Sequence, residues 1–144
     1  MHDIASFRPK DLATRLLSAP PVYPLLRRRA LRGNPVTLLC YHTLGADKDD
    51  IAAWTALRLG DFARQVEILR RVYDIVDFET ALSRGPGGDM RPMAVLTFDD
   101  GEAGLHTHLL PFVERAEVPV TVYVATSQIE TGTPYWFDRG VNAL

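Results

Sequence analysis

The amino-acid sequence predicts an α/β fold with parallel strands. Three segments are dominated by apolar, β-prone residues: "VTLLCYH" (36–42), "MAVLTF" (93–98) and "VPVTVYVAT" (118–126). Such runs are typical of strands that are buried on both faces. Segments with a helical spacing of apolar residues lie between them, and strands that alternate with helices favour a parallel sheet or barrel. Apolar residues make up 47% and charged residues 24% of the chain, which excludes a disordered or fibrous protein.

Residues 1–34 are expected to form a basic arm in front of this domain. Three prolines in "LLSAPPVYPLL" discourage a continuous helix, so only a short helical piece near residues 11–18 is expected. Residues 1–35 hold seven basic and two acidic residues, a net charge of +5 that leaves −7 for the rest of the chain. Such an arm could touch anionic lipid or nucleic acid. A solvated arm that packs loosely on its own domain is the simpler interpretation.

The first half of the domain follows the arm. After the strand at 36–42, the sequence predicts an acidic loop and then a helix over "GDFARQVEILRRVY", with Asp61 as its N-cap. "YDIVDF" (73–78) predicts a short strand. Asp77 is placed to cap the helix "FETALSRG", and Gly85 is placed to end it.

The second half repeats this alternation. After a loop over 85–92 and the strand at 93–98, a helix is marked by five apolar residues: Leu105, Leu109, Phe112, Val113 and Ala116. The third strand follows at 118–126. "YWFDRGVNAL" (135–144) is expected to begin another helix.

Cys40 is the only cysteine, so the chain cannot form an internal disulfide. Its place within a predicted strand favours a small buried hydrophobe over a reactive thiol. The first residues lack the pattern of a signal peptide, and no window of 18 apolar residues predicts a membrane span. A cytoplasmic protein is therefore the default expectation.

Polar residues follow two of the predicted strands, at Tyr41-His42 and at Asp99-Asp100. In parallel α/β folds these carboxyl ends meet at one rim, where active groups gather. Gly101 allows a sharp turn after the two carboxylates. One carboxylate could then hold a divalent metal while the other takes a proton from water. The alternative is that Asp100 merely caps the helix that starts near Glu102.

The stretch from "VLTFDDG" to "YWFDRG" (95–140) resembles the polysaccharide deacetylases, the NodB-type domain of carbohydrate esterase family 4. "TFDDG" resembles the first motif of that family, "VPVTVYVAT" its next strand, and "LLCYHTLG" the strand that opens one bacterial branch. The resemblance covers residues 35–144. It implies the N-terminal portion of a distorted (β/α) barrel.

The resemblance also implies an activity: metal-dependent hydrolysis of N-acetyl groups from an amino sugar or polysaccharide, with acetate released. Asp99 would be the general base and Asp100 a ligand of a divalent metal, zinc. His42 would contact substrate or metal-bound water, unless it is a buried structural residue. Tyr135 and Trp136 would stack on sugar rings, with core packing as the alternative for Trp136. N-acetylated carbohydrate is the implied partner, and no nucleic acid is expected.

The family completes its metal site with a later H-[ST]-x-x-H pair, which this sequence lacks. His106 and His108 are two residues apart, so on a helix their rings would diverge. The orienting arginine and the general-acid histidine are also absent. The sequence is therefore expected to need a completing segment or an oligomer. Two other readings stay open: a non-catalytic relic or carbohydrate-binding module of the same fold, and a Mg²⁺-dependent α/β hydrolase of another class.

Overall fold

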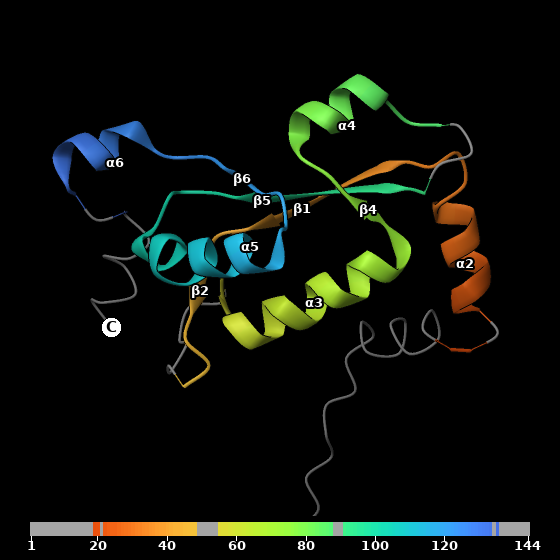
Figure 1. Cartoon of the computed structure of the whole chain (residues 1–144), viewed down its shortest axis with the longest axis horizontal. Helices are drawn as coiled ribbons and strands as arrows, with labels where there is room; N and C mark the ends of the chain where they lie inside the picture. Colours follow the sequence, from red (N-terminus) through yellow and green to blue (C-terminus); the bar gives the residue numbers. More distant parts are fainter. Residues whose placement is uncertain (1–18, 21, 49–54, 88–90, 134, 136–144) are drawn as a thin grey trace, which may run out of the picture.

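A computed structural model shows helices packed on both faces of a parallel sheet (Figure 1). The residues that it describes are 19–20, 22–48, 55–87, 91–133 and 135. Strands and helices alternate along most of this length, and all the paired strands are parallel. The predicted α/β class with parallel strands is therefore confirmed.

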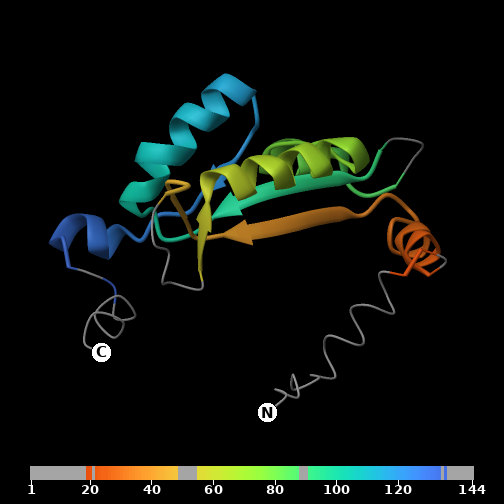
Figure 2. The same ribbon diagram turned by 90° about the horizontal axis from the view of Figure 1, so that it is seen from below.

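Strand β5 (Met93–Phe98) is the centre of the sheet. Every one of its residues is buried, as the apolar run "MAVLTF" predicts. Strand β1 (Val36–Tyr41) pairs with it along its whole length on one side. On the other side, β4 (Asp74–Ile75) pairs with the beginning of β5 and β6 (Thr121–Val122) with its end. The arrowheads of β1 and β5 consequently point to the same end of the molecule (Figure 2).

The larger core lies on one face of the sheet, under α3 (Leu59–Val72) and the continuous helical segment formed by η1 (Leu105–Leu109) and α5 (Leu110–Ala116). The ring of Phe62 packs against three other aromatic rings, with centroids 5.2 to 5.4 Å away. The predicted helix after β5 is confirmed, with the difference that Leu105–Leu109 are π-helical. These helices and β5 position the rim at which the strands end.

A smaller core lies on the opposite face, under α4 (Phe78–Arg84) (Figure 1). Asp77 caps α4 as predicted, since its carboxylate accepts a hydrogen bond from the Thr80 N–H at 2.6 Å. Gly85 ends the helix with a φ of 64°, which is a conformation that favours glycine. Within the described residues, α4 covers only the beginnings of β1 and β5 on this face.

That limited cover corrects two predictions of full burial. Leu38 in β1 is 56% exposed, and Cys40 is exposed rather than a buried hydrophobe. The third strand is only two residues long, and Val122 is 40% exposed. For Leu38 and Cys40 the physical reason is that side chains of a strand are buried only where another element packs over their face. On this face α4 packs on residues near the strand beginnings, among them Val36, Met93 and Val95.

One helix boundary was wrong. The α3 helix begins at Leu59 directly after the short strand β3 (Ala56–Arg58), so Asp61 lies in the first turn and is not the N-cap. An acidic residue in the first turn still interacts favourably with the helix dipole. The strand leads straight into the helix, which moves the start two residues before the expected cap.

Four elements were not expected. The prolines do not prevent α2 (Tyr23–Ala30), because Pro24 lies in its first turn, where a missing N–H breaks no helical hydrogen bond. Strand β2 (Thr43–Gly45) pairs with β3 in a second sheet, and α6 (Thr126–Thr131) follows β6.

The helical piece predicted at 11–18 lies outside the described residues, as does nearly all of the helix predicted at 135–144. Among the described helices, none has the length and apolar composition that a membrane crossing requires.

Candidate active site

The ends of β1 and β5 form the rim on which the candidate site lies. Tyr41 is the register partner of Phe98, and the Asp99 N–H donates a hydrogen bond to the Tyr41 carbonyl at 2.9 Å. His42 therefore leaves the end of β1 at the level at which Asp99 leaves β5. The two polar strand ends lie on one rim, as the parallel arrangement predicts.

A tight turn follows β5 at once. Asp100 has a φ of 72° and Gly101 a φ of 74°. The Gly101 N–H donates to the Asp99 carbonyl at 2.9 Å, which together with the φ of Asp100 is the pattern of a γ-turn. A left-handed φ is uncommon for a residue with a side chain, and backbone strain of this kind concentrates at functional sites. Because β5 ends at Phe98 and the turn follows, the two carboxylates do not simply alternate across the sheet.

The helix-capping alternative for Asp100 gains no support. The η1 segment begins without a side-chain cap, and the first N–H of this segment, that of Leu105, donates to the backbone carbonyl of Glu102 at 2.9 Å. Backbone geometry, and not the Asp100 carboxylate, satisfies this donor.

Two glycines allow the turn to pack against its neighbours. A Cβ atom on Gly101 would lie 2.8 Å from a methyl carbon of Val124. A Cβ on Gly104 would lie 2.4 Å from the Leu44 carbonyl oxygen and 2.7 Å from the Thr43 hydroxyl. Both distances are shorter than van der Waals contact. The turn and the start of the following helix are thus held against β2 and the segment after β6.

The Asp99 carboxylate contacts Cys40, a residue that the sequence analysis assigned to the core. The Cys40 sulfur lies 3.1 Å from Asp99 Oδ2, within hydrogen-bonding distance for a thiol donor. The hydrogen bond to Asp99, followed by partial burial and by the charge of the same carboxylate, raises the pKa of the Cys40 thiol. Cys40 therefore stays protonated and donates. Strand alternation is the signal that could have found this contact, because Cys40 is the register partner of Thr97, two residues before Asp99.

Tyr135 also contacts the turn. Its hydroxyl donates to the Asp100 backbone carbonyl at 2.6 Å, and its side chain is half-buried. The stacking of Tyr135 on a sugar stays a prediction. Trp136, the other expected sugar-binding residue, lies outside the described residues.

The described residues do not supply the metal site of the family. No group of three His, Cys, Asp or Glu side chains in this part of the chain could hold an ion, whereas a zinc site needs at least three protein ligands. His106 is exposed and His108 half-exposed on η1. The assignment of Asp100 as a metal ligand stays a prediction.

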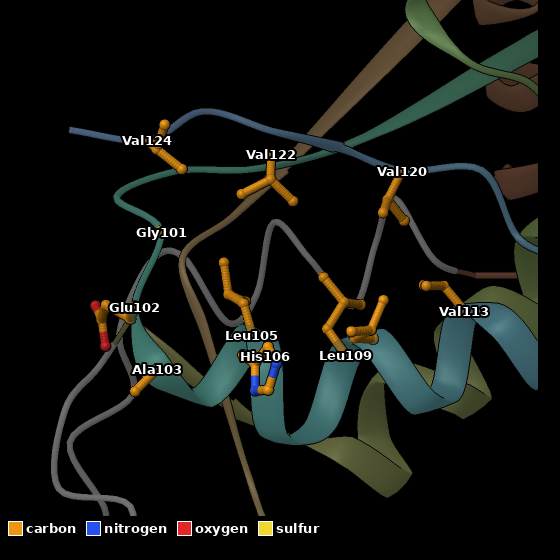
Figure 3. Close-up of a pocket in the computed structure, with 11 residues that line it drawn as sticks. Gly101, Glu102, Ala103, Leu105, His106, Leu109, Val113, Val120, Val122 and Val124 are labelled. Atoms are coloured by element: carbon orange, nitrogen blue, oxygen red, sulfur yellow. The ribbon is translucent and has the colours of Figure 1, made fainter. Parts of the chain in front are cut away.

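An apolar groove of about 300 Å³ begins at Gly101 and runs along the helical side of β6. In Figure 3, side chains of the η1–α5 segment such as Leu105 and Leu109 face Val120 and Val122 across it. A sugar needs polar partners for its hydroxyl groups, and this lining is mostly aliphatic. The groove also lies on the face of the larger core, opposite the Cys40–Asp99 contact. It is therefore a poor candidate for the sugar site.

Residues 86–141 match a family model described as polysaccharide deacetylase. This segment is thus similar to a polysaccharide deacetylase domain. The match includes the TFDDG turn and the Tyr135 contact to it, and it leaves β1 outside. No curated protein matches the sequence.

Solved structures extend the likeness to the fold around this segment. A de-N-acetylase from Aggregatibacter actinomycetemcomitans matches with 19% identity and a TM-score of 0.58, covering 70% of this chain and 43% of that chain. IcaB from Ammonifex degensii matches with 25% identity and a TM-score of 0.56, covering 67% and 40%. The deacetylase PplD from Streptococcus pyogenes matches with 21% identity and a TM-score of 0.54, covering 68% and 46%. The chain thus spans less than half the length of each of these three proteins.

Proposed function

We propose that the protein carrying this chain removes N-acetyl groups from an amino sugar or polysaccharide and releases acetate. The observation that supports this most directly is the strained TFDDG turn at the end of β5, inside the segment that matches the deacetylase family. The end of β1, with His42, lies beside it on the same rim. The structural neighbours include proteins described as de-N-acetylase and deacetylase.

In this proposal Asp99 is the general base that takes a proton from the attacking water. The Cys40 thiol lies against one of its two carboxylate oxygens, which would leave the other oxygen for the water. His42 is placed to contact the substrate from the neighbouring strand end. Tyr135 and Trp136 are proposed to contact the sugar, the first from a position already fixed against the turn.

Asp100 is proposed as one ligand of a divalent metal, with zinc as the ion that the resemblance implies. The described residues provide no complete ligand set, so the roles proposed for this chain are limited to proton transfer at Asp99 and to contacts with the substrate. We propose that a completing segment or a second chain supplies the remaining ligands. The free outer sides of β1 and β6 and the apolar groove beside β6 are surfaces that such a segment could cover.

The test is acetate release from N-acetylglucosamine oligomers by the full-length gene product, with bound metal measured in the same preparations. Asp99→Asn should abolish acetate release and keep the metal, whereas Asp100→Asn should lose the metal as well. Glu114→Gln, an exposed carboxylate on α5, is the matched control and should change neither. Full activity in both aspartate variants would contradict the assignment.

The same experiment separates the alternatives. A carbohydrate-binding relic would retain the oligomers without releasing acetate from them. A Mg²⁺-dependent hydrolase of another class would release a different product, for instance phosphate from a phosphoester, and its activity would follow Mg²⁺ instead of zinc.

A further inference from the structure

In the described structure, no other element packs closely enough on helix α2 to bury any of its side chains. None of its residues is buried. It stands at the end of the molecule where β1 begins, away from the two helical layers (Figure 2). Four apolar residues in and next to it are exposed, Val22 by 37%, Tyr23 by 54%, Leu25 by 69% and Leu26 by 38%. Single exposed apolar residues are ordinary, but four in five consecutive positions form a patch.

The same short segment is strongly basic. Arg27, Arg28 and Arg29 form the last turn of α2, and Arg32 follows it. No acidic residue occurs between Ala19 and Ala46. These arginines form no ion pair with any residue that the structure describes. Their charge is therefore available to a partner.

The two properties are arranged as on an interfacial helix. Tyr23, Leu26 and Ala30 are spaced three and four residues apart, so they share one side of α2. At 100° per residue, Arg27 and Arg29 fall on either side of that apolar stripe. Arginine side chains in this position can bury their stems along an apolar surface and keep their charged ends at its polar boundary.

We propose that α2 binds the surface of a membrane that contains anionic lipid. A polybasic segment gains affinity from anionic headgroups, and apolar side chains between the arginines add affinity by entering the boundary with the acyl chains. Nucleic acid would use the arginines but leave the aliphatic side chains exposed to water. A second copy of α2 would bring the two arginine clusters into repulsion.

The position of α2 determines which way the candidate site would face when α2 binds a membrane. The helix lies at the amino end of β1, and the turn at Asp100 lies at the carboxyl end of β5. Because the strands are parallel and six residues long, the two are separated by about 20 Å along the sheet. A protein held by α2 would turn its carboxyl rim away from the bilayer. This inference does not depend on the proposed deacetylase activity.

The test is co-sedimentation of the full chain with phosphatidylcholine vesicles that contain phosphatidylglycerol, compared with vesicles of phosphatidylcholine alone. The pellet formed without vesicles is subtracted. We expect binding only to the anionic vesicles, weakened by salt. The triple substitution Arg27→Gln/Arg28→Gln/Arg29→Gln should weaken it by about fivefold per arginine, or roughly a hundredfold in all.

Two further variants distinguish the lipid surface from a general attraction between charges. Leu26→Ser keeps every arginine and should still weaken vesicle binding several-fold, since it removes a residue of the apolar stripe. Arg71→Gln/Arg115→Gln removes two exposed arginines elsewhere and should have little effect. Because these side chains are exposed, all variants should keep the same far-ultraviolet circular dichroism.

Three results would overturn the proposal. The first is equal binding to anionic and neutral vesicles, or binding to neither. The second is unchanged vesicle binding in the leucine variant. The third is tighter binding to a short labelled DNA or RNA than to the anionic vesicles, with both lost in the arginine variant, which would identify α2 as a nucleic-acid site.

Discussion

Replacing Gly101 by alanine is the sharpest test of the turn that carries the two aspartates. The residue has a φ of 74°, and an added Cβ would lie 2.8 Å from a Val124 methyl carbon. The left-handed conformation costs a residue with a side chain about 1–2 kcal/mol. Crowding of this kind adds about 1–3 kcal/mol. Gly101→Ala should therefore lower the free energy of unfolding by about 2–5 kcal/mol, or the melting temperature by roughly 10 °C or more.

Two comparison variants separate these contributions in thermal unfolding followed by circular dichroism. Gly132 has a φ of 64°, but nothing lies within 4 Å of its added Cβ, so Gly132→Ala should show the conformational cost alone. Adding Val124→Ala to Gly101→Ala removes the methyl group that meets the new Cβ. Because Val124 is 52% exposed, its truncation should cost little by itself, and the double variant should recover part of the lost stability.

The reasoning is refuted if Gly101→Ala is no more destabilising than Gly132→Ala and if Val124→Ala gives no recovery. Either the turn would then relax at no cost, or the segment after β6 would not lie against it. In the full-length protein, acetate release should fall together with stability, because the same turn places Asp99 and Asp100.

Three further outcomes are expected. Asp99→Asn removes the carboxylate that raises the pKa of Cys40. Iodoacetamide should therefore alkylate this thiol several-fold faster at mildly alkaline pH. An unchanged rate would mean that the thiol does not contact Asp99 in solution. Phe62→Ala should lower the free energy of unfolding in urea by about 3–5 kcal/mol, because Phe62 is fully buried. Ile68→Ala on the same helix should lower it little, because Ile68 is 59% exposed. Equal effects would contradict the packing of α3. The pKa of Asp77 is lowered by its hydrogen bonds at the start of α4. The contribution of this cap to stability is therefore complete above the ordinary carboxyl pKa near 3.8. It is lost as the pH falls through the lower pKa of the folded state. Asp77→Asn, measured by thermal unfolding between neutral and acidic pH, should flatten this part of the profile; an identical profile would show that the cap does not titrate with folding.

Local patterns were enough to predict much of the fold. The apolar run of β5 requires burial on both faces wherever it lies, and every residue of it is buried. Asp77 and Gly85 mark the ends of α4 because a cap and a left-handed glycine act within a few residues of the chain. The TFDDG motif likewise brings its own turn, since Gly101 supplies the backbone freedom next to the carboxylates.

What the sequence by itself determined is therefore the class of fold, the fully buried strand at 93–98, and the rim at which β1 and β5 end side by side. Only the tertiary structure decided which side of each strand is covered. Cys40 has the same apolar neighbours in sequence as a core residue, yet it is exposed and faces Asp99, 59 residues later in the chain. The physical reason is that burial depends on which element packs over a face, and register depends on pairing with a distant strand. Neither quantity is encoded in the local pattern of residues.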